Sequence, residues 1–431
     1  MTGKGPIRAR SAVLLVVANM VGVGVFTTSG FALQDLGDRG LVLLAWLVGG
    51  LLALCGALSY GALALRFPAS GGEYEYLRRT LHPLAGTAAG LLSMFAGFSA
   101  PIAAAAHLLQ VYGCRLFDLA APALPWTGTV AILLAWAMHS GRVHLGARLQ
   151  DLVVALKLLL AAGFLVLSLR LLGAPATDGG SVTTTPWNGF ASSMPWIYLA
   201  YSGWNAAAYV AGEVVDARRN VPRAMLLGTL VVTGLYLALN AVFLWSSDAT
   251  LLTGRPEIAA IAAENLLGRP GEVLVTGIVV LALLTSITGM MMAGPRVYAR
   301  MAQAGELPRQ LAAPGDRPPR AALLLQTVLA LGFLWAAQLQ ELMTYIGWTL
   351  SLSAAATVWG LVRVRRREGP QAVPCPGWPW VPFTFLAAVT WFALAKVIAA
   401  PRDCLLGLGT LLLVVLLAPK AGKRGVASAE H

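Results

Sequence analysis

Long apolar segments separated by short polar loops dominate this chain. Each segment is close to the roughly 20 residues that an α-helix needs to cross the hydrocarbon core of a bilayer. The pattern therefore predicts an all-α integral membrane protein with about twelve transmembrane helices. The predicted spans are residues 11–33, 41–65, 84–112, 127–141, 150–171, 189–213, 222–246, 272–300, 321–338, 342–362, 380–399 and 404–418.

The basic residues fall mainly in alternate loops. With the N-terminus placed in the cytoplasm, 23 of the 31 Lys and Arg residues lie in inner segments and 6 in outer loops. Cytoplasmic loops of membrane proteins carry an excess of Lys and Arg, so we expect both termini to be cytoplasmic. The first apolar run is too long for a cleavable signal and has no small-residue cleavage site.

Composition agrees with this class. The 431 residues are 58% hydrophobic and 12% charged, whereas a soluble domain has about 25% charged residues. The net charge of +12 is located in the short loops, so membrane topology explains it and no nucleic-acid partner is expected. The 26 Arg against 5 Lys residues are typical of a GC-rich bacterial source. We therefore expect a bacterial inner membrane protein.

Two glycines interrupt the first span, where residues 19–26 read NMVGVGVF. Each glycine inside a helix costs about 0.5–1 kcal/mol relative to Ala. One explanation is close packing of two helices. The other is an unwound segment, which frees carbonyl groups at the end of the inner half-helix and amide groups at the start of the outer one. Together these opposite partial charges could bind a zwitterion.

The sixth span carries a similar interruption. Residues 196–213 read WIYLAYSGWNAAAYVAGE, with Ser202 and Gly203 among aromatic residues. If spans 1–5 form one repeat, their odd number inverts the next five, and span 6 becomes the counterpart of span 1. Paired interruptions at corresponding positions indicate the midplane binding site of a transporter. This favours the unwound explanation, although the repeat is inferred from topology and not from residue identity between the halves.

Two lysines lie inside predicted spans. Lys157 is about seven residues into span 5, or roughly 10 Å deep. Its ammonium either extends to the cytoplasm or faces the protein interior, where helix-end carbonyls are its simplest partners. Lys396 is about three residues from the outer end of span 11, and we expect it to reach the headgroup layer. We also expect the loop GGEYEYLRR to lie along the cytoplasmic face, with its aromatic and basic residues in that layer.

Several motifs, in order, resemble the amino acid–polyamine–organocation (APC) superfamily, and the segment around span 6 is similar to its L-type amino acid transporter branch and bacterial relatives. The motifs are GVGVF (22–26), FPASGGEYEYL (67–77), AYSGWNAAAYVAGEVVDARRNVPRA (200–224), RVYARMAQAGELP (296–308) and PGWPWVP (376–382). The resemblance implies a fold of five plus five inverted spans, with discontinuous first and sixth helices and two further helices. The implied parts are a tail (1–10), a first repeat (11–173), a second repeat (189–363), two C-terminal helices (379–418) and a second tail (419–431).

The resemblance also implies a substrate site at the two interruptions. Its residues would be Asn19, Val21, Gly22, Val23, Gly24, Leu199, Ala200, Tyr201, Ser202, Gly203 and Trp204. Backbone groups at Val21 to Gly24 would meet the substrate carboxylate, and Asn19 to Gly22 would supply carbonyls. Ala200 to Gly203 would offer carbonyls to the α-amino group, while Leu199 and Trp204 would border the side-chain pocket.

The resemblance also implies a role for Lys157. It matches a span-5 lysine that many family members carry at the position where sodium-coupled relatives of this fold bind a cation. It would bridge the inner half of span 1 to span 8, where Ser286 or Thr285 would accept its hydrogen bond. The chain departs from the family at two positions. Val23 replaces the usual Ser, which removes a hydroxyl contact to the carboxylate, and Leu199 stands where many L-type members carry an aromatic gate.

These features predict a secondary-active transporter of a small zwitterion by alternating access. A neutral L-amino acid is favoured, because no acidic residue is expected deep in the core. The alternatives are a proton-coupled symporter of cationic amino acids or polyamines, with protons as coupling ion, and an amino acid sensor. We expect no enzyme activity, because the core shows no cluster of ionisable or metal-binding side chains and no phosphate-binding loop, and we expect no cofactor or metal.

The expected partners are the amino acid and membrane lipids. Cys114 opens the outer loop after span 3, where heteromeric members of the family tether a single-span partner through a disulfide. In a bacterial chain we expect a free thiol there and no heavy-chain partner.

Overall fold

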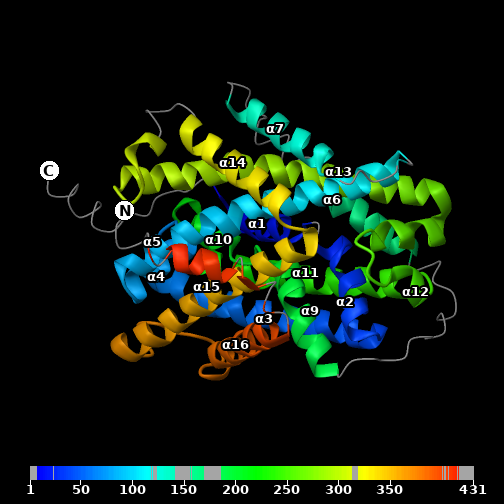
Figure 1. Ribbon diagram of the computed structural model, residues 1–431. Coiled ribbons are helices and arrows are strands. Elements are labelled where there is room, and N and C mark those ends of the chain that lie inside the picture. Colours follow the sequence, from blue (N-terminus) through cyan, green and yellow to red (C-terminus); the bar gives the residue numbers. More distant parts are fainter. Residues whose placement is uncertain are drawn as a thin grey trace.

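The structure is a computed structural model. It describes residues 7–22, 24–117, 119, 124–140, 156, 158–168, 186–312, 319–399, 401, 404–405, 407–414 and 416. Within these residues the secondary structure is helical, apart from one isolated β-bridge between Ile7 and Val214. Figure 1 shows the long helices running roughly along one direction.

The described residues form the following helical elements, given in chain order. They are α1 (Ala9–Met20), η1 (Gly24–Phe26), α2 (Thr28–Leu36), α3 (Arg39–Arg66), α4 (Gly72–Thr80), α5 (Pro83–Leu92), η2 (Ser93–Ser99), α6 (Ala100–Leu116), α7 (Trp126–Ser140), α9 (Pro186–Tyr201), α10 (Ala206–Tyr209), η3 (Ala211–Glu213), α11 (Ala217–Trp245), α12 (Ala249–Leu252), α13 (Ile258–Gln303), η4 (Arg309–Leu311), α14 (Arg320–Ala336), α15 (Leu339–Glu368) and α16 (Trp380–Ala399).

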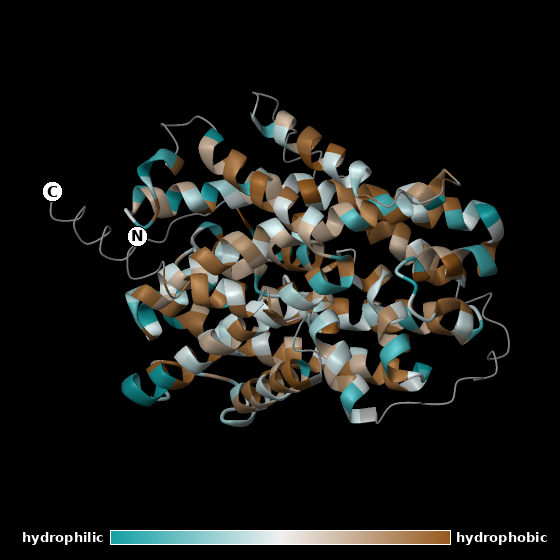
Figure 2. Cartoon of the chain, in the orientation of Figure 1, coloured by the Kyte–Doolittle hydropathy of each residue, from teal (hydrophilic) through white to brown (hydrophobic). Residues whose placement is uncertain are grey.

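Six helices in the described part of the chain are long and apolar enough to cross a membrane. They are Arg39–Arg66, Pro83–Leu116, Ala217–Trp245, Ile258–Gln303, Leu339–Glu368 and Trp380–Ile398. Shorter apolar helices are Ala9–Met20, Leu158–Ser168 and Arg320–Ala336. In Figure 2 hydrophobic residues occupy the middle of the molecule and hydrophilic residues gather toward its two ends. This is an integral membrane protein, and the count of twelve spans stays a prediction.

Local sequence signals explain several helix boundaries. Gly37 ends α2 in the left-handed conformation (φ 67°), which glycine adopts without steric cost. The Asp38 side chain then accepts a hydrogen bond from the Leu41 N–H at 2.7 Å and caps α3. Gln338 and Glu341 form a reciprocal capping box at the start of α15. Gly268 (φ 66°) bends α13 between a short first part and the longer apolar part.

The interrupted segments lie in the middle of the helical packing. The helix α1 packs against α11 and α10, while α9 packs against α2, α3, α15 and α16. Figure 1 shows α1, α10 and α11 in the middle of the molecule, with α9 extending from there to its lower edge. The fold therefore places both interruptions inside the protein, away from the ends of the spans.

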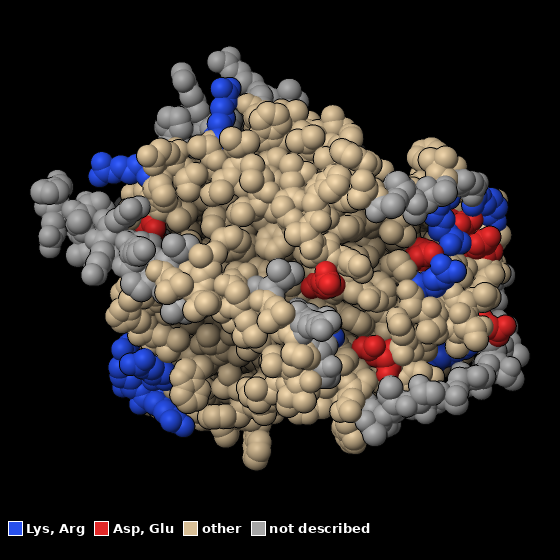
Figure 3. Space-filling model, in the orientation of Figure 1, with Lys and Arg blue, Asp and Glu red and all other residues tan. Residues whose placement is uncertain are grey.

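The charged side chains are concentrated at the two ends of the molecule. In Figure 3 basic residues gather at the lower left, where α15 ends with Arg365, Arg366 and Arg367 in its last turn. The right-hand end carries both signs. There Arg115, at the end of α6, pairs with Glu264 and Glu272 of α13. An apolar band between two charged ends is the arrangement that a bilayer requires.

Candidate substrate site at two interrupted helices

The first glycine-bearing segment is a break between two helices. The helix α1 ends at Met20, and helical structure resumes with the short turn η1 and then α2. At the break the Gly22 N–H donates to the Met20 carbonyl at 2.7 Å, which is a tighter turn than an α-helix makes. Val23, whose amide is one of the predicted carboxylate contacts, lies outside the described residues.

The second segment is also a break. The helix α9 ends at Tyr201, residues 202–205 form turns, and α10 and η3 follow. Gly203 has φ 100°, a conformation that side chains with a Cβ rarely adopt. The Ser202 N–H donates to the Leu199 carbonyl at 2.9 Å, which closes the last turn before the break.

The two breaks pack directly against each other. A Cβ built on Gly203 would lie 2.8 Å from the carbonyl carbon and oxygen of Asn19, in the last turn of α1. A Cβ built on Gly24 would lie 2.7 Å from Cα of Ala200, in the last turn of α9. The glycine of each break thus contacts the backbone that leads into the other. Only glycine fits at either position without moving the facing backbone.

One buried tyrosine contacts both breaks. The Tyr236 hydroxyl, on α11, lies 3.1 Å from the Ala200 carbonyl oxygen and within hydrogen-bond distance of the Met20 carbonyl oxygen. Its single hydrogen is donated to one of them at a time. Met20 also accepts from Gly22, so its carbonyl is the least available of those predicted in the first break. A carbonyl oxygen has two lone pairs, so Ala200 retains capacity for a second donor.

A polar network fixes the surroundings of Tyr236. The Trp46 indole N–H donates to the Ser29 hydroxyl at 2.7 Å, and that hydroxyl hydrogen bonds to Asn240. The Asn240 amide donates to the Tyr236 carbonyl at 2.8 Å, and the Tyr201 hydroxyl donates to the Trp46 carbonyl at 3.0 Å. The network joins α2, α3, α9 and α11, so it holds both breaks to one scaffold. Tyr201 was predicted in the substrate site, but its side chain belongs to this network.

Backbone at both breaks remains accessible. Gly22, Gly24, Ser202 and Gly203 are partly exposed although their neighbours in the core are buried. A Cβ on Gly22 would meet only the Met20 oxygen, at 3.8 Å, within 4 Å. The first N–H groups of a helix have no intrahelical acceptor. The two breaks therefore bring helix-end backbone groups together at partly exposed positions.

The side chains that were predicted to border the substrate, Trp204 and Leu199, pack against different helices. Trp204 is buried, with its ring 4.7 Å from Tyr60 of α3 and 6.5 Å from Phe385 of α16 between centroids. Leu199 is only partly buried and packs against a cluster that includes Phe31 of α2 and Met343 of α15. The Asn19 side-chain amide donates to the Leu15 carbonyl of its own helix at 2.8 Å, and its backbone carbonyl faces Gly203.

The predicted coupling group is only partly described. Lys157 lies outside the described residues. Of its expected acceptors on α13, the Thr285 hydroxyl donates to the Leu281 and Ala282 carbonyls of its own helix at 3.0 and 2.9 Å. Ser286 is partly buried on the same helix. The role of Lys157 stays a prediction.

A buried acidic residue, Glu73, lies between predicted spans 2 and 3, in the segment that was expected along the cytoplasmic face. Glu73 is 7% exposed, and its carboxylate accepts hydrogen bonds from Tyr60 and Ser353. The segment GGEYEYLRR forms α4, whose buried residues include Glu73, Tyr76 and Thr80. These positions repeat at i, i+3 and i+7, the spacing of one helix face. That periodicity in the sequence is the signal that would have identified the buried carboxylate.

Lys396 corrects a second expectation. Its side chain is 4% exposed, and Nζ lies 5.0 Å from the centre of the Trp196 ring. The ammonium is attracted to the electron-rich face of an indole. The lysine therefore turns inward onto α9 and does not extend to the headgroup layer. His107 of α6 is also partly buried, with Nε2 at 3.0 Å from the Ala337 carbonyl oxygen.

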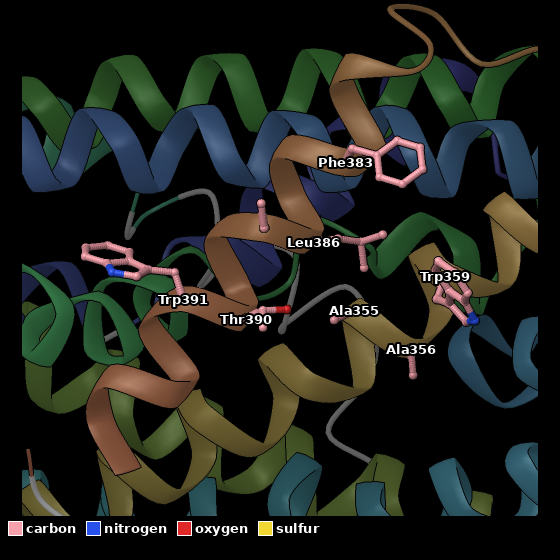
Figure 4. Close-up of a pocket in the computed structure, with 8 residues that line it drawn as sticks. Ala355, Ala356, Trp359, Phe383, Leu386, Thr390 and Trp391 are labelled. Atoms are coloured by element: carbon pink, nitrogen blue, oxygen red, sulfur yellow. The ribbon is translucent and has the colours of Figure 1, made fainter. Parts of the chain in front are cut away.

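A pocket of about 720 Å³ lies elsewhere, between α15 and α16. Figure 4 shows Trp359 on α15 and Phe383, Leu386 and Trp391 on α16 along its walls. Thr390 contributes a hydroxyl, and the other lining residues are apolar. A zwitterion needs partners for two charges, so this pocket does not suit an amino acid. The breaks remain the candidate site.

Comparison with known proteins gives a family match and several full-length relatives. The sequence model of the amino acid permease family matches residues 7–408. The chain is 26% identical over 419 residues to the mouse large neutral amino acids transporter small subunit 2, covering 93% of this chain and 78% of that protein. It is 26% identical over 401 residues to the Bacillus subtilis serine/threonine exchanger SteT, covering 91% of each. Human Asc-type amino acid transporter 1 is 26% identical over 429 residues, covering 95% and 80%.

Proposed function

Because the chain belongs to the amino acid permease family, we propose that it is a secondary-active transporter that moves a small zwitterionic amino acid by alternating access. The observation that carries the proposal is the reciprocal packing of Gly203 on Asn19 and of Gly24 on Ala200. It places helix-end amides and carbonyls from two interrupted helices side by side. Interrupted helices of this kind bind substrates in transporters without a dedicated charged side chain.

The substrate carboxylate would bind amide groups of the first break, predicted between Val21 and Gly24. The Val21 and Gly22 N–H groups donate to the Val17 and Met20 carbonyls, so the contact would come from the amides that follow Gly22. Gly24 is the first residue of η1, which leads into α2, and the partial charge at the start of a helix is positive. The α-amino group would bind carbonyls between Ala200 and Gly203, at the negative end of α9. Val23 has no hydroxyl, so the grip on the carboxylate depends on backbone alone. Trp204 and Leu199 would then shape the space for the substrate side chain.

A neutral L-amino acid is the substrate class that we favour. The buried carboxylate of Glu73 already accepts hydrogen bonds from side chains of the protein, so it does not require a cationic substrate. Two relatives, a large neutral amino acids transporter subunit and a serine/threonine exchanger, are named for neutral amino acids, which supports a neutral substrate. Exchange of one amino acid for another is the favoured mode, with Lys157 as a fixed cation in place of a coupling ion.

We further propose the topology that this mechanism needs. Spans 1–5 and 6–10 would form two inverted repeats, with two C-terminal helices outside them and both termini in the cytoplasm of a bacterial cell. The bridge between Ile7 and Val214 supports part of this arrangement, because it joins the segment before α1 to the segment after η3. The match to SteT covers nearly the whole of both chains, and we propose that this chain works without a heavy-chain partner.

Counterflow in proteoliposomes tests the function. Purified protein would be reconstituted into liposomes that contain unlabelled serine or leucine, and the labelled amino acid would be added outside at about one tenth of the internal concentration. A tenfold ratio of concentrations supplies about 1.4 kcal/mol of driving force. The expected result is transient accumulation of label above its external concentration. Liposomes without protein and liposomes loaded with arginine are the controls. Ligand-induced thermal stabilisation without flux would support a sensor instead, and conductance without saturable exchange would support a channel.

A further inference from the structure

Glu73 lies at the centre of a buried polar cluster that the substrate site does not use. One carboxylate oxygen accepts from the Tyr60 hydroxyl at 2.8 Å and from the Asn205 side-chain amide at 3.3 Å. The other accepts from the Ser353 hydroxyl at 2.5 Å. Each donor comes from a different part of the fold. Tyr60 is on α3, Asn205 is the last residue of the second break, and Ser353 is on α15.

The same helix makes further contacts with the segment that follows the second break. Gly72 (φ 52°) is so close to the Tyr209 ring of α10 that a Cβ there would lie 2.6 Å from a ring carbon. The Gly212 N–H donates to the Ser70 hydroxyl at 2.9 Å. Figure 1 shows α4, α10 and α15 near one another toward the left end of the molecule. This is the end where the basic last turn of α15 lies, which the sequence predicts to be cytoplasmic.

In the part of the chain that the structure describes, the polar groups that contact the Glu73 carboxylate are two hydroxyls and one side-chain amide. The titratable groups that act on it or respond to it are the hydroxyls of Tyr60 on α3, Tyr198 on α9 and Tyr209 on α10. On α4 itself, Glu75 pairs with Arg79. Burial raises the pKa of the Glu73 carboxyl above its ordinary value, and the hydrogen bonds from Ser353 and Tyr60 oppose that shift.

We propose that the ionised Glu73 carboxylate is a latch that holds the segment after the second break against α3 and α15, and that a proton binding to it releases the latch. The proton comes from the adjacent aqueous phase and forms an O–H bond on one carboxylate oxygen. The neutral acid is a donor and a weaker acceptor. One of the two hydroxyl groups must then turn to accept its hydrogen and stops donating to the carboxyl group, while the Asn205 amide donates to a weaker acceptor. Charge-assisted hydrogen bonds are roughly twice as strong as neutral ones, so the segment is held less tightly.

This inference rests on the proposed function, because release of the latch matters only in a transport cycle. The mobile part would be residues 203–213, whose start contributes to the substrate site. Release would let this end of the transporter open after substrate binds. Glu73 is thus a positioning residue, acting on the substrate through Asn205 and the break. Its effect should depend on the pH of the compartment that faces α4.

The test compares Glu73→Gln with Glu75→Gln. Both variants lose one carboxylate on α4, but Glu75 is partly exposed and pairs with Arg79 of its own helix, whereas Glu73 accepts a hydrogen bond from Asn205 of the second break. Amino acid exchange would be measured in proteoliposomes, with the internal pH varied at a fixed external pH. Hydrogen–deuterium exchange of residues 203–213 would be measured on the same preparations, with α3 as internal reference.

In the wild type we expect amino acid exchange to accelerate as the pH on the α4 side falls. In Glu73→Gln, amino acid exchange should lose this pH dependence. At high pH, residues 203–213 of this variant should exchange deuterium about tenfold faster than in the wild type, because the charge-assisted hydrogen bonds to Glu73 are weakened. Glu75→Gln should match the wild type in both measurements. Retention of the wild-type pH profile and protection by Glu73→Gln would overturn the proposal, as would the same changes in Glu75→Gln.

A second variant keeps the test valid if Glu73→Gln does not fold. Ser353→Ala removes one donor to the carboxylate and leaves the acid in place. Because the Ser353 hydrogen bond lowers the pKa of Glu73, its loss should move the pH profile of exchange toward higher pH, and an unmoved profile would contradict the latch. A wild-type protein without amino acid exchange would refute the proposed function, whereas deuterium exchange would still decide whether Glu73 holds residues 203–213.

Discussion

Gly203 lies in direct backbone contact with Asn19, across two helices that are both interrupted at this point. A Cβ at Gly203 would lie 2.8 Å from the Asn19 carbonyl carbon and oxygen, and its φ of 100° is a conformation that suits glycine. The contact is matched by Gly24 on Ala200. Because the two contacts are reciprocal, a change in one break is transmitted to the backbone of the other.

Gly203→Ala should therefore abolish exchange or reduce it by at least about tenfold. The new methyl group must displace backbone, and the strained φ adds a cost of about 1 kcal/mol or more. Exchange in proteoliposomes is the measurement, and the amount of folded protein is checked by size-exclusion chromatography. Gly234→Ala is the matched control, because a Cβ at Gly234 in α11 meets nothing within 4 Å. Equal activities of the two variants would contradict the account.

Tyr236→Phe should weaken substrate binding with little change in the fold. The variant removes the hydroxyl that contacts the Met20 and Ala200 carbonyls, so both breaks lose a shared donor. A lost hydrogen bond to a buried carbonyl costs about 1–2 kcal/mol, which corresponds to a rise in KM for exchange of about 5- to 30-fold. Tyr298→Phe is the control, since its hydroxyl makes a longer 3.4 Å bond to Met94, away from the breaks. A Tyr236→Phe protein with wild-type KM would remove the hydroxyl from the site.

Lys157→Met tests the coupling group, whose position the structure does not describe. If Lys157 is a fixed cation that joins span 1 to span 8, its loss should slow exchange strongly and alter its dependence on pH. The pH profile of exchange in proteoliposomes is the measurement. Unaltered rate together with an unaltered profile would exclude Lys157 from the mechanism.

Arg115→Ala should lower stability more than the loss of an exposed arginine. The Arg115 side chain is 23% exposed and joins α6 to Glu272, which is 3% exposed, and to Glu264. Its removal leaves Glu272 with Arg269 and should cost about 1–3 kcal/mol. Arg367→Ala is the control, because that side chain is 64% exposed and its pair with Glu368 should contribute about 0–1 kcal/mol. Thermal unfolding in detergent compares the two, and equal midpoints would contradict the prediction.

The sequence predicted the breaks because their signal is local. Gly22, Gly24 and Gly203 stand inside apolar runs where glycine is costly, and each interrupts a helix in the structure. Most span boundaries could be predicted for the same reason, since apolar length and loop polarity determine them. The mutual contact of the breaks could not be predicted, because it depends on packing between residues about 180 positions apart.

Glu73 and Lys396 show where reasoning from the sequence failed. Glu73 lies in a predicted cytoplasmic segment and Lys396 lies near the end of a predicted span, and charge at such positions usually indicates a solvated surface. In the structure Glu73 finds three donors from distant segments and Lys396 finds the Trp196 ring. Partners that come from elsewhere in the chain leave no local pattern. The alternation of buried and exposed positions in α4 was present in the sequence, but it was obscured by the density of charged residues there.

The central claim is that an amino acid binds between backbone groups of the two interrupted helices. A high-resolution cryo-electron microscopy map of the purified protein with saturating serine or leucine tests it most directly. We predict density for the ligand with its carboxylate at the amides of the first break that follow Gly22, and with its amino group at the carbonyls of residues 200–203. Continuous helical hydrogen bonding through both segments, or ligand density only in the pocket between α15 and α16, would contradict it.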